Sequence, residues 1–169
     1  MTNLDPFHVS SEEECRDVLE TVGLWELVEK RGGLMEGLSG EMLSQGQKQL
    51  FSLARAVLRR RIRAREREND FGAAVAAREK GRGDGGILLL DEVSSNVDQV
   101  TDRVMQEIIM HEFKGYTIVM VSHRLEMVID FDRVVVMERG CVVEEGEPRE
   151  LVGMEGGKFK ELWEVGHKS

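Results

Sequence analysis

An unbroken aliphatic run from Ile87 to Leu90 restricts the fold of this chain more than any other feature. It follows a glycine-rich stretch and leads directly into two acidic residues, Asp91 and Glu92. A short aliphatic run with these boundaries is typical of a strand that is buried on both faces, as in a parallel sheet covered by helices. We therefore predict an α/β protein in which residues 87–90 form a buried strand.

Local signals place the other elements. A capping box at Ser10 and Glu13 predicts a first helix that ends at Gly23, and a short helix follows over 24–30. A longer helix begins at Ser44, where the S-x-x-Q pattern is repeated. After it we predict a helix from residue 97, a buried strand at 116–121 and a short helix at 125–130. A β-hairpin around 138–140 and surface helices over 147–165 complete the chain. The side chains of the surface helices that we expect to pack inward are Leu151, Phe159, Leu162 and Trp163.

The 169 residues carry a net charge of −9 that is unevenly distributed. Residues 59–85 hold 9 of the 23 Lys and Arg and 5 of the 32 Asp and Glu, a local charge of +4, which leaves −13 for the remainder. The acidic remainder argues against nonspecific nucleic-acid binding. The basic segment has two interpretations, a nucleic-acid patch or a solvated loop. Its first residues could extend the preceding helix by a turn or two, and its Gly-rich end favours a flexible, disordered insertion.

Cysteine usage and hydropathy indicate the compartment. Two cysteines, Cys15 and Cys141, cannot form a disulfide framework, which favours a reducing, cytosolic setting. No apolar run approaches the roughly 20 residues of a membrane-spanning helix, so we expect no direct membrane insertion. The N-terminus lacks the basic start and apolar stretch of a signal peptide. These features predict that the chain itself is soluble.

Three segments carry the candidate chemistry. Ligands bind at the carboxyl ends of strands in open α/β sheets, where Asp91 can hold Mg²⁺ through water and Glu92 can polarise an attacking water. The alternative for these acids is a turn that favours the next helix N-terminus. The segment LSQGQ at 43–47 is either an anion site at a helix N-terminus or an ordinary capped helix. His123, after the second strand, either contacts a phosphate or water, or serves as a capping or packing residue.

Taken together and in this order, these segments resemble an ATP-binding-cassette (ABC) ATPase domain. LSQGQ resembles the family signature, ILLLDE the Walker B strand with the catalytic glutamate, SSNVD the D-loop, and SHR the switch-histidine loop. RVVVMERGCVVEEGEPREL resembles the closing hairpin and helix of the family. NLDPF and VGLWELVEKRGGL are similar to the second nucleotide-binding domain of the C subfamily, the multidrug-resistance-associated transporters.

The resemblance implies a role for each site residue. Asp91 would hold the Mg²⁺ of Mg-ATP through water, Glu92 would be the general base for the attacking water, and His123 would contact the γ-phosphate. In this family two domains enclose two ATP molecules head to tail. The signature residues would therefore act on the ATP of the partner domain, with Asp98 reaching across the interface; they are Ser44, Gln45, Gly46 and Gln47.

The resemblance also implies an organisation. We expect a P-loop NTPase-type α/β fold, incomplete at its N-terminal side, with a largely parallel sheet, a helical subdomain and a C-terminal β-hairpin. The expected division is a helical subdomain over 1–58, a disordered insertion over 59–85 and the C-terminal half of the ATPase core over 86–169. The parent protein would hydrolyse ATP to drive solute export, with a second nucleotide-binding domain and transmembrane domains as partners. It would lie at the cytoplasmic face of a membrane.

The chain departs from the family pattern in one major respect. A P-loop needs G-x-x-x-x-G-K-[ST], but the only Gly-Lys pair, Gly157-Lys158, is followed by Phe159 and has Val152 where the motif needs Gly. We therefore expect the isolated chain to be inactive as an ATPase. Two alternatives remain: a soluble ABC ATPase that moves no solute, and a non-catalytic module that offers only its signature face to a complete cassette.

Overall fold

The computed structural model describes residues 4–35, 43–70, 85–91 and 97–166. These residues form two compact units. The first, called here the helical unit, comprises the described residues up to Leu89 together with 97–119. The second, called the C-terminal unit, comprises Leu90, Asp91 and 120–166.

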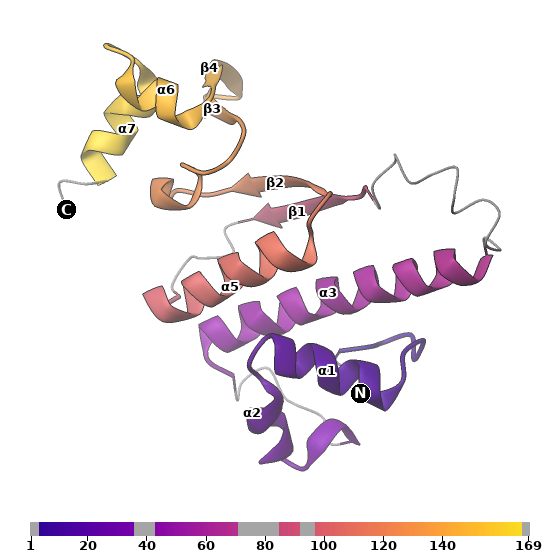
Figure 1. The fold of residues 1–169 in the computed structure, drawn as a ribbon. Helices are drawn as coiled ribbons and strands as arrows, with labels where there is room; N and C mark the ends of the chain where they lie inside the picture. Colours follow the sequence, from indigo (N-terminus) through magenta and orange to yellow (C-terminus); the bar gives the residue numbers. More distant parts are fainter. Residues whose placement is uncertain (1–3, 36–42, 71–84, 92–96, 167–169) are drawn as a thin grey trace. The chain divides into compact units, whose positions relative to one another are not determined.

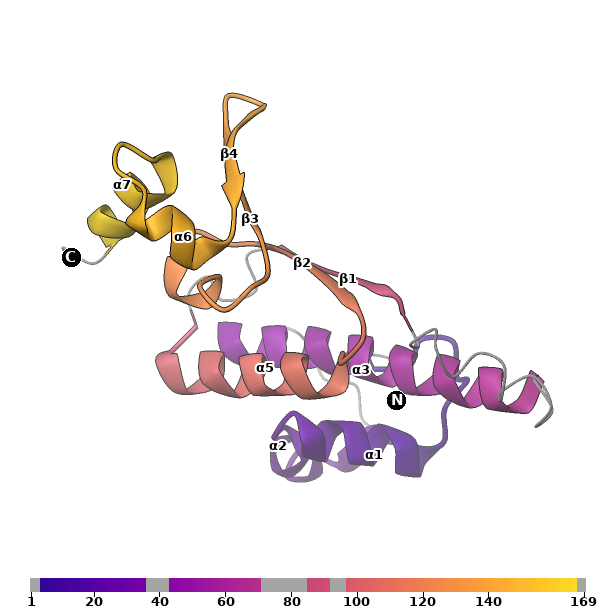
Figure 2. The same ribbon diagram turned by 45° about the horizontal axis from the view of Figure 1, so that its top comes forward.

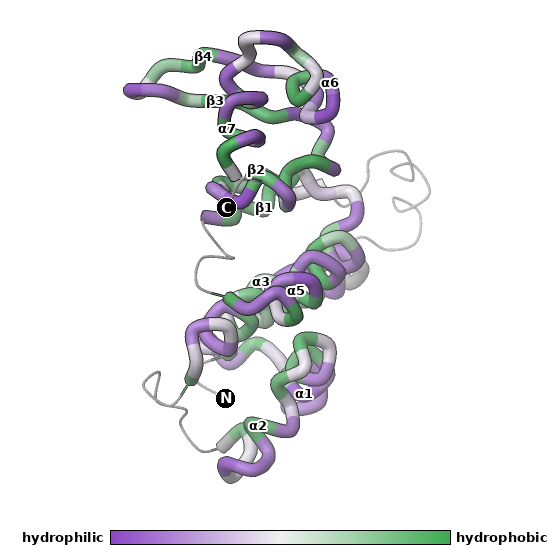
Figure 3. Tube along the Cα trace, turned by 90° about the vertical axis from the view of Figure 1, so that its left-hand side faces the viewer, coloured by the Kyte–Doolittle hydropathy of each residue, from purple (hydrophilic) through white to green (hydrophobic). Residues whose placement is uncertain are grey.

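The helical unit is built around one long helix. Its helices are α1 (Glu12–Thr21), α2 (Trp25–Glu29), a 3₁₀ turn η1 (Gly33–Met35), α3 (Gln45–Asp70) and α5 (Gln99–Glu112). Figure 1 shows α1 along one side of α3 and α5 along the other, and Figure 2 shows α5 beside the N-terminal half of α3. Hydrophobic and hydrophilic segments alternate along α3 and α5 in Figure 3, as in helices that bury one face. The buried side chains of the three helices include Val18, Leu19, Ala54, Val57, Met105 and Ile109.

The first helix begins one residue later than its capping signal predicted. Ser11 is the N-cap: its hydroxyl accepts from the Glu14 amide at 3.1 Å, and its own amide donates to the Glu14 carboxylate at 2.7 Å. Ser10 instead donates through its amide to the buried carboxylate of Asp5, at 2.8 Å. The predicted Ser10 and Glu13 box is therefore wrong by one position, because Asp5 already engages Ser10.

Helix α3 continues well beyond the predicted start of the insertion. Residues 59–70 are helical, and Ile62 is only 6% exposed. Val57, Leu58 and Ile62 extend the apolar stripe at helical spacing, and Arg is a good helix former. The first part of the segment that we expected to be disordered therefore packs as helix, whereas residues 71–84 lie outside the described residues. The three-part division of the chain stays a prediction.

Two predicted strands, β1 (Ile87–Asp91) and β2 (Thr117–Val121), are hydrogen-bonded neighbours. Figure 1 draws them running in the same direction, with α5 between them in the chain. Leu88 and Leu90 are buried, but Ile87 is 70% and Leu89 72% exposed. The prediction of a strand buried on both faces is therefore wrong within the described residues, since they cover only one face of β1.

The C-terminal unit contains the predicted hairpin and surface helices. Strands β3 (Val134–Glu138) and β4 (Cys141–Gly146) pair antiparallel as the predicted hairpin. The described strands thus form two two-stranded sheets, and the expected largely parallel sheet stays a prediction beyond the β1–β2 pair. Both turn residues, Arg139 and Gly140, have positive φ (50° and 81°), as a type I′ turn requires. The 3₁₀ turn η3 (Leu125–Met127) and helices α6 (Pro148–Gly153) and α7 (Lys158–Gly166) complete the unit.

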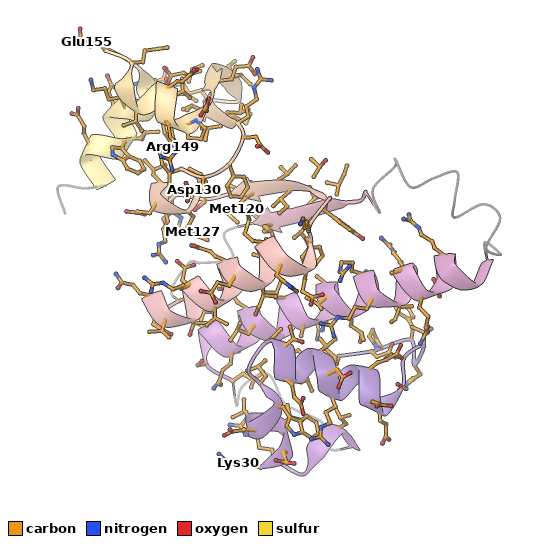
Figure 4. The ribbon with its side chains drawn as sticks, in the orientation of Figure 1. Lys30, Met120, Met127, Asp130, Arg149 and Glu155 are labelled. Carbon is orange, nitrogen blue, oxygen red and sulfur yellow. The ribbon has the colours of Figure 1, made fainter. Side chains whose placement is uncertain are left out.

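A small apolar cluster holds the C-terminal unit together. Val128, Leu151 and Phe159 form its centre, and the partly buried Trp163 packs against them. Leu162, which we expected to point inward, is 47% exposed. At the edge of the unit, Arg149 of α6 pairs with Asp130 at 2.8 Å (Figure 4).

Candidate functional site

The N-terminus of α3 is the part of the candidate site that the structure defines best. The Ser44 hydroxyl accepts from the Gln47 amide at 3.2 Å, and the Gln47 side chain accepts from the Ser44 amide at 3.0 Å. This confirms the predicted S-x-x-Q capping box. Ser44 and Gln45 are exposed, and Gly46 and Gln47 are partly so. The helix end, with its partial positive charge, thus faces solvent with a hydroxyl beside it.

Gly46 sits where α3 meets α5. A methyl group placed on Gly46 would lie 3.3 Å from Thr101 Cγ2 and 3.6 Å from Val97 Cγ1. Glycine at this position therefore lets the N-terminal turns of the two helices pack closely. As a consequence, the signature residues and the start of α5 are neighbours within the helical unit.

Asp98 is the N-cap of α5. Its carboxylate accepts from the amides of Val100 and Thr101 at 3.1 and 3.0 Å and from the Thr101 hydroxyl at 2.7 Å. The hydrogen bond from the Thr101 amide, followed by that from its hydroxyl, lowers the pKa of Asp98. The side chain is thus an ionised cap, and two capped helix N-termini stand side by side at this end of the helical unit.

The other candidate residues belong to the C-terminal unit. Asp91 is the exposed last residue of β1, and His123 follows the end of β2 by two residues. Since β1 and β2 are neighbours that run in the same direction, both residues lie at the same end of the pair. The Ser122 hydroxyl accepts from the Arg124 amide at 3.0 Å and forms a tight turn that leaves His123 exposed.

The structure does not place every predicted site residue. Glu92 and the first three residues of the D-loop-like segment, 94–96, lie outside the described residues. Among the described residues, no three His, Cys, Asp or Glu side chains cluster in a way that could hold a metal ion. The metal-binding role predicted for Asp91 therefore stays a prediction, based on its position and on the chemistry of one carboxylate.

The Gly157-Lys158 pair serves a structural purpose. Lys158 opens α7, and its ammonium group pairs with Glu161 at 2.9 Å. The next amide, of the fully buried Phe159, donates to the Glu144 carboxylate at 2.6 Å. This turn therefore anchors α7 to the hairpin and does not provide a phosphate cradle.

Sequence reasoning missed four residues that organise the helical unit. Thr101 supports Asp98 and contacts Gly46, and the D-x-x-T spacing from Asp98 is a capping signal that could have revealed it. Arg60 and Arg61 pair with the buried Glu112. No local pattern marks that pairing, because the partners are more than fifty positions apart and the arginines stand in a charge-dense stretch.

Comparison with known proteins connects this geometry to a class of transporter. The chain is 55% identical over 164 residues to the ABC-type transporter braE of Annulohypoxylon truncatum, a match that covers 97% of the chain and 10% of that protein. It is 52% identical over 167 residues to the ABC transporter FGM5 of Gibberella zeae (98% of the chain, 10% of that protein). It is 38% identical over 161 residues to the ABC multidrug transporter B of Aspergillus fumigatus (95% and 9%).

Over nearly its whole length the chain is thus homologous to a segment of fungal ABC transporters. It spans about a tenth of the length of these curated relatives. No protein-family model matches the chain. Within the described part of the chain, no helix combines the length and the apolar character needed to cross a membrane.

Proposed function

We propose that the chain is part of the ATP-hydrolysing domain of an ABC exporter, similar to the second nucleotide-binding domain of the C subfamily. The observation that carries the proposal is the exposed, Ser44-capped N-terminus of α3, which packs through Gly46 against Thr101 at the start of α5. Helix N-termini favour anions through their free amides and their dipole. The naming of the relatives as ABC transporters supports a nucleotide phosphate as that anion.

The donors at the α3 end fit a phosphate group. The hydroxyl of Ser44 accepts from Gln47 and keeps its own proton to donate outward. The amides of the first helical turn, including that of Gly46, have no partner within the helix. We infer that Ser44, Gln45, Gly46 and Gln47 bind the γ-phosphate of an ATP held by a second domain, and that Asp98 faces that domain.

A second set of residues would act on the ATP of this domain. Asp91 presents a hard oxygen ligand at the end of β1, which suits Mg²⁺ bound through water. Glu92 would accept the proton of the attacking water, and the exposed His123 would orient that water or contact the phosphate. Bound Mg²⁺ would neutralise charge on the phosphates, so the contribution of the chain is positioning and proton acceptance.

Hydrolysis also requires a phosphate cradle that residues 1–169 do not contain. Gly157-Lys158 is committed to α7, and its lysine is paired with Glu161. We therefore propose that hydrolysis occurs when a P-loop elsewhere in the parent transporter completes the site. The partners would be a second nucleotide-binding domain and the transmembrane domains, at the cytoplasmic face of a membrane.

A chimera tests the proposal. Residues 1–169 replace the corresponding segment of a full-length relative, and ATP hydrolysis and ATP binding are measured separately. Glu92→Gln should abolish hydrolysis at this site and leave ATP binding intact, because Gln keeps the shape but takes no proton. Asp91→Asn should weaken Mg²⁺-dependent binding, whereas the exposed hairpin variant Glu138→Gln should change neither. Normal hydrolysis by Glu92→Gln would refute the general-base assignment.

The isolated chain offers a complementary test. Purified wild-type chain and its Glu92→Gln variant should show indistinguishable ATP turnover, since no cradle positions the substrate. A Mg²⁺-dependent difference between them would show that the chain binds and hydrolyses ATP by itself.

A second candidate function is a non-catalytic module that docks onto a complete cassette. The observation in its favour is that the described residues build the signature end, while the Gly157-Lys158 turn is occupied structurally. A pull-down of the chain with a complete cassette and ATP would show retention that Ser44→Arg abolishes. Equal retention of Ser44→Arg would contradict this function.

A further inference from the structure

Helices α3 and α5 are joined at two separate places. Near their N-termini, Gly46 of α3 packs against Thr101 of α5. Toward the C-terminal end of α5, Arg60 and Arg61 of α3 reach Glu112. Figures 1 and 2 show the two helices side by side between these places. Two such contacts suffice to fix how far one helix is displaced along the other.

The second contact is a buried ionic cluster. The Glu112 side chain is only 7% exposed. It accepts from Arg61 at 2.7 Å through Nη2 and 3.3 Å through Nε, and from Arg60 Nη2 at 2.9 Å. Arg61 Nη2 also donates to the Thr21 hydroxyl of α1 at 3.2 Å, so three helices meet at this carboxylate.

The geometry of the cluster matters more than its contribution to stability. A buried ion pair is weak evidence for stability, because apolar side chains of similar volume often serve as well. The two hydrogen bonds that the guanidinium fork of Arg61 donates to the two carboxylate oxygens, however, are directional and tolerate little sliding of α3 along α5. A rigid helix transmits any sliding at Arg61 to its other end, about 25 Å away at 1.5 Å per residue.

We propose that Glu112, with Arg60 and Arg61, is a positioning device that holds the N-termini of α3 and α5 in register. The signature residues at Ser44 would then face a partner nucleotide, and the cap at Asp98 would face the partner domain, as parts of one rigid surface. This inference rests on the proposed function for its catalytic consequence. It makes Glu112 a positioning residue that touches no nucleotide.

The catalytic test uses the full-length chimera. Glu112→Gln should lower kcat about tenfold and leave the KM for ATP within about twofold, because the signature end is displaced while nucleotide binding elsewhere is retained. Arg61→Lys should lower kcat similarly, because Lys keeps the charge but lacks the fork. Glu20→Gln, which breaks the exposed Arg16–Glu20 pair, is the matched control and should leave both constants unchanged.

The Arg61→Lys variant distinguishes two explanations for the effect of the cluster: the directional hydrogen bonds of Arg61, and its positive charge alone. Wild-type kcat in Arg61→Lys, or a loss in Glu112→Gln no larger than in Glu20→Gln, would overturn the proposal. If the Glu112→Gln chimera fails to fold, Arg61→Lys carries the decision. If hydrolysis proves insensitive to Glu92→Gln, the general-base assignment within the proposed function fails, and the positioning role is then decided by amide exchange.

The exchange test uses the 169-residue chain without nucleotide. The amides of Lys48 and Asp102 donate to the carbonyls of Ser44 and Asp98 at 2.9 and 3.0 Å and report on the two N-termini. Glu112→Gln should speed exchange at both about tenfold, and exchange at Cys15, in the first turn of α1, should change far less. A uniform increase across the helical unit, or none, would show that the cluster only stabilises the fold.

Discussion

The helical unit and the C-terminal unit are stabilised by different means. The helical unit buries a carboxylate between two arginines and caps its helix ends with side chains. The C-terminal unit centres on the apolar cluster around Phe159, and its pair of Arg149 with Asp130 is exposed by 70% and 74%. The helical unit thus adds a buried ionic cluster to its apolar core, whereas the centre of the C-terminal unit is a small apolar cluster. Removal of charge should therefore affect mainly the helical unit, and the C-terminal unit should be the more sensitive to loss of a single large apolar side chain.

The largest effect is expected from Phe159→Ala. The side chain is 1% exposed at the centre of the C-terminal cluster, and removal of such a ring costs about 3–5 kcal/mol. Urea titration, monitored through amide exchange in β3 and β4, should show this loss of unfolding free energy. Leu162→Ala, one helical turn away and 47% exposed, should cost less than about 1 kcal/mol. Equal losses for the two variants would contradict the assignment of the core.

Glu112→Ala should have the next largest effect, in the helical unit. Removing one partner of a buried pair costs about 3–5 kcal/mol, but Arg60 and Arg61 are 27% and 33% exposed and regain water, so we expect about 2 kcal/mol. A double-mutant cycle with Arg61→Ala measures the coupling. Additive losses from the two single variants would show that the pair contributes nothing to the helical unit.

Gly46→Val tests the other contact between α3 and α5. A branched side chain would press on Thr101 and Val97, with an expected cost of about 1–2 kcal/mol. Gly46→Ala places a methyl at 3.3 Å from Thr101 Cγ2, and the gain in helix propensity offsets part of the strain. Thermal unfolding should therefore give similar Tm values for the wild type and Gly46→Ala, and a lower Tm for Gly46→Val. If Val were as stable as Ala, the helices would not be in close contact at Gly46.

The smallest effect is expected from acid. Burial raises the pKa of Glu112, but hydrogen bonds from Arg61 and Arg60, and their charges, outweigh it and hold the pKa below the ordinary value of 4.5. The folded state therefore binds this proton less well than the unfolded state. The stabilisation of the folded state by the ionised Glu112 carboxylate is complete above about pH 4.5 and is lost as the pH falls through the lowered pKa.

Exchange in α5 measured between pH 6 and pH 3 should detect this loss, and Glu112→Gln should reduce the pH dependence. The groups facing the carboxylate are Arg60 and Arg61 of α3, Thr21 of α1 and His111, whose Nδ1 is 4.0 Å away. His111→Gln serves as the control for the imidazole. An unchanged pH profile in Glu112→Gln would assign the acid sensitivity to other carboxylates.

The sequence predicted the parts of the fold that depend on neighbouring residues. The Ser44 cap, both central strands and the hairpin at Arg139-Gly140 follow from local spacing and turn chemistry. Exposure of one face of β1 could not be predicted, because it depends on which elements cover the strand. The same holds for Glu112, whose partners come from a distant helix. At the site, the ends of α3 and of β1 were placed correctly, whereas the packing of Gly46 on Thr101 required the structure.

The exposed aliphatic face of the β1–β2 pair has a consequence for the tendency of the chain to aggregate. Ile87 and Leu89 on β1, and Val119 and Val121 on β2, are each about half exposed or more. Among the described residues this sheet has only two strands, so both are edges, and an exposed aliphatic edge strand is a template for aggregation. Asp91 ends the aliphatic run and so acts as a gatekeeper charge. Asp91→Asn would remove that protection together with the proposed Mg²⁺ ligand. Loss of activity of this variant in the chimera must therefore be separated from loss of dispersed protein by size-exclusion chromatography.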